Sequence, residues 1–107
     1  VVLVAADVTD PADRRAMLDA ALSQFGGLDV LINNAGIGAT GHFMDSDPET
    51  LRRIFEVNYF GLCEVTRAFL PLLKRGTTPA IVNISSVVGR RALPGGGLYS
   101  SSKFAVA

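Results

Sequence analysis

The residues best suited to chemistry are a tyrosine and a lysine near the end of the chain. Tyr99 and Lys103 are four positions apart, so on a helix they lie on one face, one turn apart. A lysine ammonium group at that spacing stabilises the phenolate form of a tyrosine, which suits the pair to general acid–base catalysis. An exposed tyrosine and an exposed lysine on a helix surface are the alternative, because this spacing is common by chance.

A serine provides a second candidate group. Ser86 ends an apolar run and precedes Tyr99 by 13 residues. A loop of that length can bring Tyr99 back beside Ser86, whose hydroxyl could then hold a carbonyl or alcohol oxygen and stabilise its developing charge. The alternative is that Ser85 and Ser86 cap the turn after a strand, which is a frequent use of serine.

Two groups of asparagines also indicate a site. The segment Asn33-Asn34-Ala35-Gly36 follows the apolar pair Leu31-Ile32 at once, and its glycine allows a turn or a close approach to a ligand. Asn58 interrupts the apolar stripe of a predicted helix, between Ile54 and Leu62. A buried amide needs hydrogen-bond partners, so Asn58 is either part of a site or a polar bridge within the core.

The remaining polar residues give weaker signals. Asp7 follows the first apolar run and could contact a ligand such as an adenine amino group, or only belong to a turn. The arginines at 90–91 are expected to be solvated, and His42 and Cys63 are assigned no role. No Cys, His and carboxylate set has metal-ligand spacing, and Ser86 lacks the G-x-S-x-G context of a hydrolase.

The elements that must position these residues alternate along the chain. Short apolar runs predict three strands, at 1–5, 28–33 and 80–84, and helical periodicity with capping signals predicts three helices, at 11–25, 48–75 and from Tyr99 onward. Asp10-Pro11 and Asp47-Pro48 are typical helix starts, and Gly26-Gly27 is a typical end. This order predicts an α/β fold: a partial, doubly wound, Rossmann-like parallel sheet. In such sheets ligands bind beyond the carboxyl ends of the strands.

Composition excludes several classes of protein. The chain is 49% hydrophobic and 19% charged with a formal net charge of zero, which excludes a disordered chain and gives no electrostatic argument for nucleic acid. A single cysteine rules out an internal disulfide and favours a reducing compartment. No apolar stretch reaches the roughly 18 residues of a membrane span, so we expect a soluble, cytoplasmic protein.

Taken together, these motifs resemble the short-chain dehydrogenase/reductase family, in its classical branch, from about Val4 to Ala107. Five pieces occur in the family's order, and Ser86 has the family's spacing to Tyr99: Asp7-Val8, Asn33-Asn34-Ala35-Gly36, Val57-Asn58, Ile81-Val82-Asn83-Ile84-Ser85-Ser86 and Tyr99…Lys103. The resemblance implies an oxidoreductase that transfers a hydride between NAD or NADP and a small alcohol or carbonyl substrate. It also implies a homo-oligomer, either a dimer or a tetramer.

The resemblance also implies a role for each matching residue. Tyr99 would exchange the proton, Lys103 would bind the nicotinamide ribose and lower the pKa of the tyrosine, Ser86 would orient the substrate oxygen, and Asn58 would hold a relay water. The implied cofactor contacts are Asp7 and Val8 at the adenine, Asn34, Ala35 and Gly36 along the cofactor, and Tyr99 with Lys103 at the nicotinamide end.

The sequence departs from the family pattern by omission. Residues 1–107 correspond to a partial NAD(P)-binding domain without the glycine-rich T-G-x-x-x-G-x-G turn that would hold a pyrophosphate, the strand that usually selects NAD or NADP, or the C-terminal substrate-binding part. In the family's strand order, two strands absent here lie between this chain's first and second strands. We therefore expect these residues alone to be poorly stable and inactive.

Other functions stay open at this point. A dinucleotide-binding regulator could keep the fold without turnover, although it has no need of Tyr99, Lys103, Ser86 and Asn58 together. The chain could also be an inert fragment. An epimerase or dehydratase of the extended branch is a further alternative, against which the segment Asn33-Asn34-Ala35-Gly36 argues.

Overall fold

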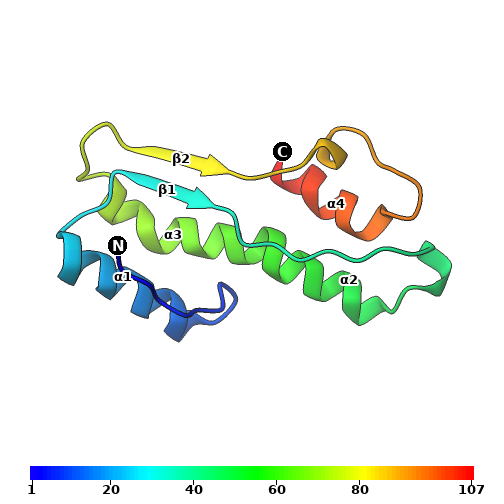
Figure 1. Cartoon of the computed structure of the whole chain (residues 1–107), viewed down its shortest axis with the longest axis horizontal. Coiled ribbons are helices and arrows are strands. Elements are labelled where there is room, and N and C mark those ends of the chain that lie inside the picture. Colours follow the sequence, from blue (N-terminus) through cyan, green and yellow to red (C-terminus); the bar gives the residue numbers. More distant parts are fainter.

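A computed structural model describes all 107 residues, and its centre is a short parallel sheet. The strands β1 (Val30–Asn33) and β2 (Ala80–Asn83) pair in parallel, with Val30 opposite Ala80 and Asn33 opposite Asn83. Figure 1 shows them side by side, with both arrowheads toward the same end of the molecule. The predicted α/β class and parallel pairing are confirmed, and both strands lie inside their predicted ranges.

The first helix begins and ends where its capping residues predict. The helix α1 spans Pro11–Phe25, and the Asp10 side chain accepts hydrogen bonds from the backbone N–H groups of Ala12 and Asp13. Gly26 ends the helix with a φ of 73°, a left-handed conformation that glycine adopts without steric cost. These signals work through contacts within four residues, which is why the sequence alone locates both ends.

The predicted long helix is continuous but changes its winding in the middle. It consists of α2 (Pro48–Phe55), a π-helical segment η2 (Glu56–Gly61) and α3 (Leu62–Leu73). Its apolar stripe supplies most of the buried core, namely Ile54, Val57, Val65, Phe69, Leu72 and Leu73. A single π-helical turn within an α-helix is frequent at functional sites, and this one contains Asn58.

The prediction of a third strand at 1–5 is wrong. These residues form no strand and pair with neither β1 nor β2, and Val1 and Leu3 are almost fully exposed. A strand exists through hydrogen bonds to a neighbour, and no strand pairs with the second edge of β1 here. Residues 1–5 have the apolar pattern of a buried strand, but this pattern cannot by itself supply a neighbouring strand to pair with.

The last helix lies past the sheet and beside the long helix. The helix α4 spans Gly97–Val106, so it begins two residues before the predicted start at Tyr99. In Figure 1 it lies beyond the carboxyl ends of β1 and β2, and it packs against α2, η2 and the short 3₁₀ turn η3 (Val87–Gly89). This position places the Tyr99–Lys103 turn at the strand ends, where ligands bind in sheets of this kind.

One face of the sheet is covered and the other is open. The helix α3 packs on β1, and α1 packs on α3, as Figure 1 shows below the two strands. On the opposite face Val30 and Ile32 are 46% and 60% exposed. None of the helices is both long and apolar enough to cross a membrane.

Candidate functional site

Asn58 is buried and its side chain joins three parts of the chain. Its Oδ1 accepts a hydrogen bond of 2.8 Å from the backbone N–H of Ile37, and its Nδ2 donates one of 2.9 Å to the Ile37 carbonyl. The same Nδ2 donates to the hydroxyl of Ser102 in α4 at 2.9 Å. The amide therefore ties the loop after β1 to η2 and to α4. Its oxygen and its nitrogen both have hydrogen-bond partners, as a buried amide requires.

Lys103 is also buried, although lysine is seldom found so. Its Nζ donates a hydrogen bond of 2.8 Å to the carbonyl of Ile84, just after β2, and lies 5.7 Å from the centre of the Tyr99 ring. Burial lowers the pKa of Lys103 below its ordinary 10.5, because a less polar environment disfavours the ammonium form. The predicted face shared by Tyr99 and Lys103 is present in the structure.

Two glycines let the loop after β1 pass close to this pair. A Cβ carbon on Gly36 would stand 3.3 Å from Oδ1 of Asn58 and 3.6 Å from Nζ of Lys103. A Cβ carbon on Gly38 would stand 3.4 Å from Cδ2 of the Tyr99 ring. The loop thus runs along the Tyr99–Lys103 turn with its backbone close to the side chains of these two residues.

The two serines after β2 have different partners. The Ser86 hydroxyl accepts a hydrogen bond of 3.3 Å from the N–H of Val88 and so caps η3, as one of the two interpretations of the sequence expected. The Ser85 hydroxyl donates to the carbonyl of Lys103 at 2.8 Å. The turn η3 packs against α4, and the Ser86 hydroxyl accepts in the capping bond and has no acceptor of its own within the chain.

Asp7 lies apart from these residues on the surface. Its carboxylate accepts hydrogen bonds from the backbone and hydroxyl of Thr9 and forms an ion pair with Arg53 at 3.3 Å. The Thr9 hydrogen bonds, followed by the Arg53 charge, lower the pKa of Asp7 below its ordinary 3.8. The structure therefore gives Asp7 protein partners of the kind that a turn provides.

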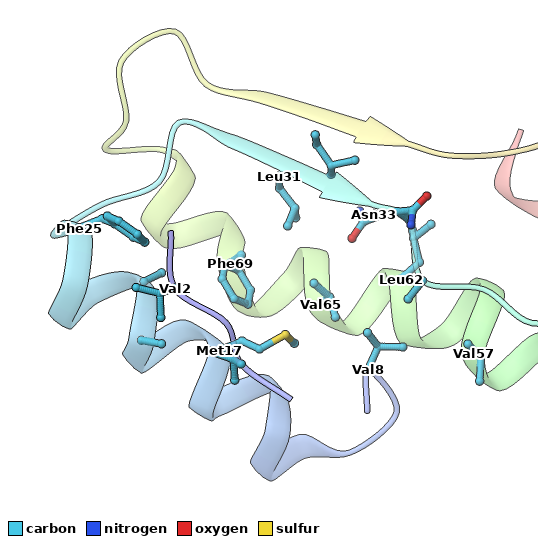
Figure 2. Close-up of a pocket in the computed structure, with 16 residues that line it drawn as sticks. Val2, Val8, Met17, Phe25, Leu31, Asn33, Val57, Leu62, Val65 and Phe69 are labelled. Atoms are coloured by element: carbon cyan, nitrogen blue, oxygen red, sulfur yellow. The ribbon is translucent and has the colours of Figure 1, made fainter. Parts of the chain in front are cut away.

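Three more predicted residues, Val8, Asn34 and Ala35, line an apolar cavity of about 310 Å³. Figure 2 shows side chains of α1, such as Met17, and of α3, such as Phe69, directed into it. Asn58, Ser86, Tyr99 and Lys103 do not line this cavity. Its lining is almost entirely aliphatic and aromatic and includes no ionisable side chain, so the cavity itself has no group for acid–base chemistry.

The predicted site residues thus fall into two groups. Gly36, Asn58, Tyr99 and Lys103 lie close together, and Ser86 caps η3, the turn that packs against α4. The remaining residues, Asp7, Val8, Asn34 and Ala35, lie toward α1 and its cavity. No group of three or more His, Cys, Asp or Glu side chains is placed to hold a metal ion.

Sequence reasoning missed Gly38 and Ser102. Gly38 has no motif that marks it, and its contact with the Tyr99 ring depends on how the loop folds back. Ser102 is the last of three successive serines, of which Ser100 and Ser102 are buried and Ser101 is exposed, and only Ser102 bonds Asn58. Its spacing of three from Tyr99 was the available signal.

Comparison with known proteins identifies the family. The family model described as short chain dehydrogenase matches residues 1–107. The chain belongs to this family. It is 40% identical over 99 residues to the bovine (Bos taurus) dehydrogenase/reductase SDR family member 7B, an alignment that covers 92% of this chain and 30% of that protein.

Solved structures of short-chain dehydrogenases agree with this fold. A short-chain dehydrogenase/reductase from Burkholderia phymatum, crystallised in complex with NAD, matches with a TM-score of 0.87 and 39% identity over 94% of this chain and 36% of that one. The ligand-free aldohexose dehydrogenase of Thermoplasma acidophilum matches with a TM-score of 0.87 and 37% identity, covering 94% and 39%. The chain spans about a third of the length of these three dehydrogenases.

Proposed function

We propose that the protein containing this chain is an NAD(P)-dependent oxidoreductase that interconverts a small alcohol and its carbonyl compound. Family membership and the NAD complex of the Burkholderia phymatum relative support the cofactor. The observation that carries the proposal is the contact between Lys103, Tyr99 and the loop at Gly36, at the carboxyl ends of the strands. Asn58, Ser86, Tyr99 and Lys103 are the catalytic residues of this proposal.

The residues around Gly36 fit a nicotinamide cofactor. The ammonium group of Lys103 has three N–H donors and one protein acceptor, the Ile84 carbonyl, so two donors remain for the hydroxyls of a ribose. Because Gly36 has no side chain, nothing of this residue beyond its backbone stands next to the amino group. When bound, the nicotinamide supplies or accepts the hydride.

The rest of the cofactor would lie along the loop after β1. Asn34 and Ala35 would line it next to Gly36, and Asp7 and Val8 would contact its adenine end. Asn34, Ala35 and Val8 share one cavity wall, which supports this direction.

Tyr99 is the proposed proton donor and acceptor. Its hydroxyl forms no hydrogen bond within the chain, so it is free to meet a substrate oxygen. The charge of Lys103 stabilises negative charge that develops on the tyrosine oxygen. In the reductive direction Tyr99 donates its proton to the oxygen of the carbonyl as that oxygen gains negative charge.

Ser86 and Asn58 would assist this proton transfer. Ser86 accepts from the N–H of Val88 and keeps its own O–H to donate to the substrate oxygen. Both N–H groups of Asn58 are used by Ile37 and Ser102, so a relay water would bind the second lone pair of Oδ1. The proton lost by Tyr99 would be replaced through this water.

The remaining features of the whole protein follow the same proposal. Residues 1–107 form part of its NAD(P)-binding domain, and the whole protein is a homo-oligomer acting on a small molecule in the cytoplasm. A dinucleotide-binding regulator without turnover is the alternative from another class. The two differ in whether bound cofactor is consumed.

The experiment is to measure NAD(P)H oxidation by the full-length protein against a panel of carbonyl compounds. Tyr99→Phe removes only the hydroxyl and should lower turnover by about 100-fold or more while cofactor binding is retained. Tyr59→Phe is the matched control, since Tyr59 lies in η2 with its ring edge against Phe60. Cofactor binding without turnover by the wild type would support the regulator instead.

A further inference from the structure

The hydroxyl of Ser102 is completely buried and both of its hydrogen-bonding functions are used. It accepts a hydrogen bond of 2.9 Å from Nδ2 of Asn58 and donates one of 2.8 Å to the backbone carbonyl of Tyr99. A hydroxyl that donates and accepts at once cannot rotate freely, so its position is fixed. Ser102 has no exposed surface, so bulk solvent does not contact this hydroxyl.

This hydroxyl completes a network that runs through the whole candidate site. Asn58 binds both the N–H and the carbonyl of Ile37 in the loop that follows Gly36. Through Ser102, the same amide reaches the first turns of α4, where Tyr99 and Lys103 lie. The loop, η2 and α4 therefore meet at one chain of hydrogen bonds, and Ser102 is the residue of α4 that bonds the Asn58 amide.

We propose that Ser102 is a positioning residue that holds the Tyr99–Lys103 turn against Asn58. The inference rests on the proposed function and adds to it a residue that touches neither substrate nor cofactor. Ser102 lies next to Lys103 in sequence and bonds the backbone of Tyr99, so a shift at Ser102 moves both groups together. The Tyr99 ring must also keep its close contact with Gly38, which leaves little room for such a shift.

The adjacent Ser101 is a natural comparison for the bond between Ser102 and Asn58. Its hydroxyl donates to the carbonyl three residues earlier, Leu98, at 2.8 Å, just as Ser102 donates to Tyr99. Ser101 is exposed and makes no contact with Asn58. The two serines thus share residue type, helix and backbone bond, and they differ in the link to Asn58 and in burial.

The test compares Ser102→Ala with Ser101→Ala in the full-length protein. We expect Ser102→Ala to lower kcat by up to about 100-fold, because small displacements of catalytic groups are costly, with KM and cofactor affinity within about twofold of wild type. Ser101→Ala should leave all three unchanged. Equal kcat values for the two variants would overturn the proposal, because the loss of a serine that is only buried, with no positioning role, would not lower kcat specifically.

A second measurement decides the matter if the wild type turns nothing over. Amide hydrogen exchange of α4 should be faster in Ser102→Ala than in Ser101→Ala, and equal exchange would overturn the positioning role. Failure of the proposed function is thereby separated from failure of this inference. Should Ser102→Ala not fold, Ser102→Thr and Ser102→Val replace it, because Thr and Val have the same shape and differ in the hydroxyl. Ser102→Val should then show the lower kcat and the faster exchange of α4, and Ser102→Thr should not.

Discussion

Gly36 lies directly beside the amino group of Lys103. A Cβ carbon at position 36 would stand 3.6 Å from that nitrogen, and 3.3 Å from Oδ1 of Asn58. The φ of Gly36 is not in the left-handed region, so the constraint at this position is one of space and not of backbone conformation. Space is also what a cofactor would need here, which makes position 36 a direct test of the proposed site.

Gly36→Ala should weaken cofactor binding while changing the fold little. The added methyl group takes the space next to Lys103 and presses on Asn58, so we expect about a tenfold rise in the Kd for NAD(P)H, equivalent to about 1.4 kcal/mol. The cost in unfolding free energy should be about 1 kcal/mol. Fluorescence titration of NAD(P)H and urea denaturation of the full-length protein measure the two quantities.

The control for this variant is Gly27→Ala. A Cβ carbon at Gly27 would meet nothing within 4 Å, and its φ is also outside the left-handed region. It should therefore leave the cofactor Kd unchanged. If Gly36→Ala binds NAD(P)H as tightly as Gly27→Ala, the cofactor does not pass this glycine.

Asn58→Ala should destabilise the protein strongly. It removes partners from the N–H and carbonyl of Ile37 and from the completely buried hydroxyl of Ser102. Each unsatisfied buried group costs about 1–3 kcal/mol, so we expect the unfolding free energy to fall by about 3 kcal/mol or more. Chemical denaturation without cofactor is the measurement.

Asn34→Ala is the matched comparison for Asn58→Ala. Asn34 carries the same amide but is exposed, and its side chain makes no hydrogen bond within the chain. Its loss should cost no more than about 0.5 kcal/mol. Similar losses for both variants would mean that the Asn58 network does not stabilise the fold.

Lys103→Met should change how stability depends on pH. Because burial lowers the pKa of Lys103 in the folded chain, the unfolded chain binds more protons between that pKa and 10.5. The wild type therefore gains stability as pH rises through this window, whereas the variant lacks this contribution. The wild-type-minus-variant difference in unfolding free energy should increase as the pH rises above the lowered pKa of Lys103 and level off above about 10.5.

Denaturation curves for the full-length protein at several pH values test this dependence. The same comparison with Lys74→Met subtracts the general effect of losing one positive charge, since Lys74 is exposed. A difference for Lys103→Met that stays flat with pH would show that the amino group is not held in a desolvated position. Whatever the pH dependence, Lys103→Met should lose turnover, because the proposed ribose contact is gone.

The sequence by itself determined the features that depend on near neighbours in the chain. The ends of α1 follow from Asp10 and Gly26, whose capping contacts span no more than four residues. The start of α2 follows from Asp47 in the same way, through its bond to the N–H of Glu49. The apolar stripe of the long helix and the shared face of Tyr99 and Lys103 follow from helical periodicity alone.

Only the tertiary structure decided which of these features meet. The apolar run at 1–5 has a strand pattern but no neighbour with which to pair, so it is not a strand. The bond from Asn58 to Ser102 spans 44 positions, so local periodicity places Ser102 on the helix but does not show that it meets this amide. That contact depends on parallel pairing of β1 and β2, which brings both carboxyl ends together and places α4 against η2, and no contact within a few residues encodes that pairing.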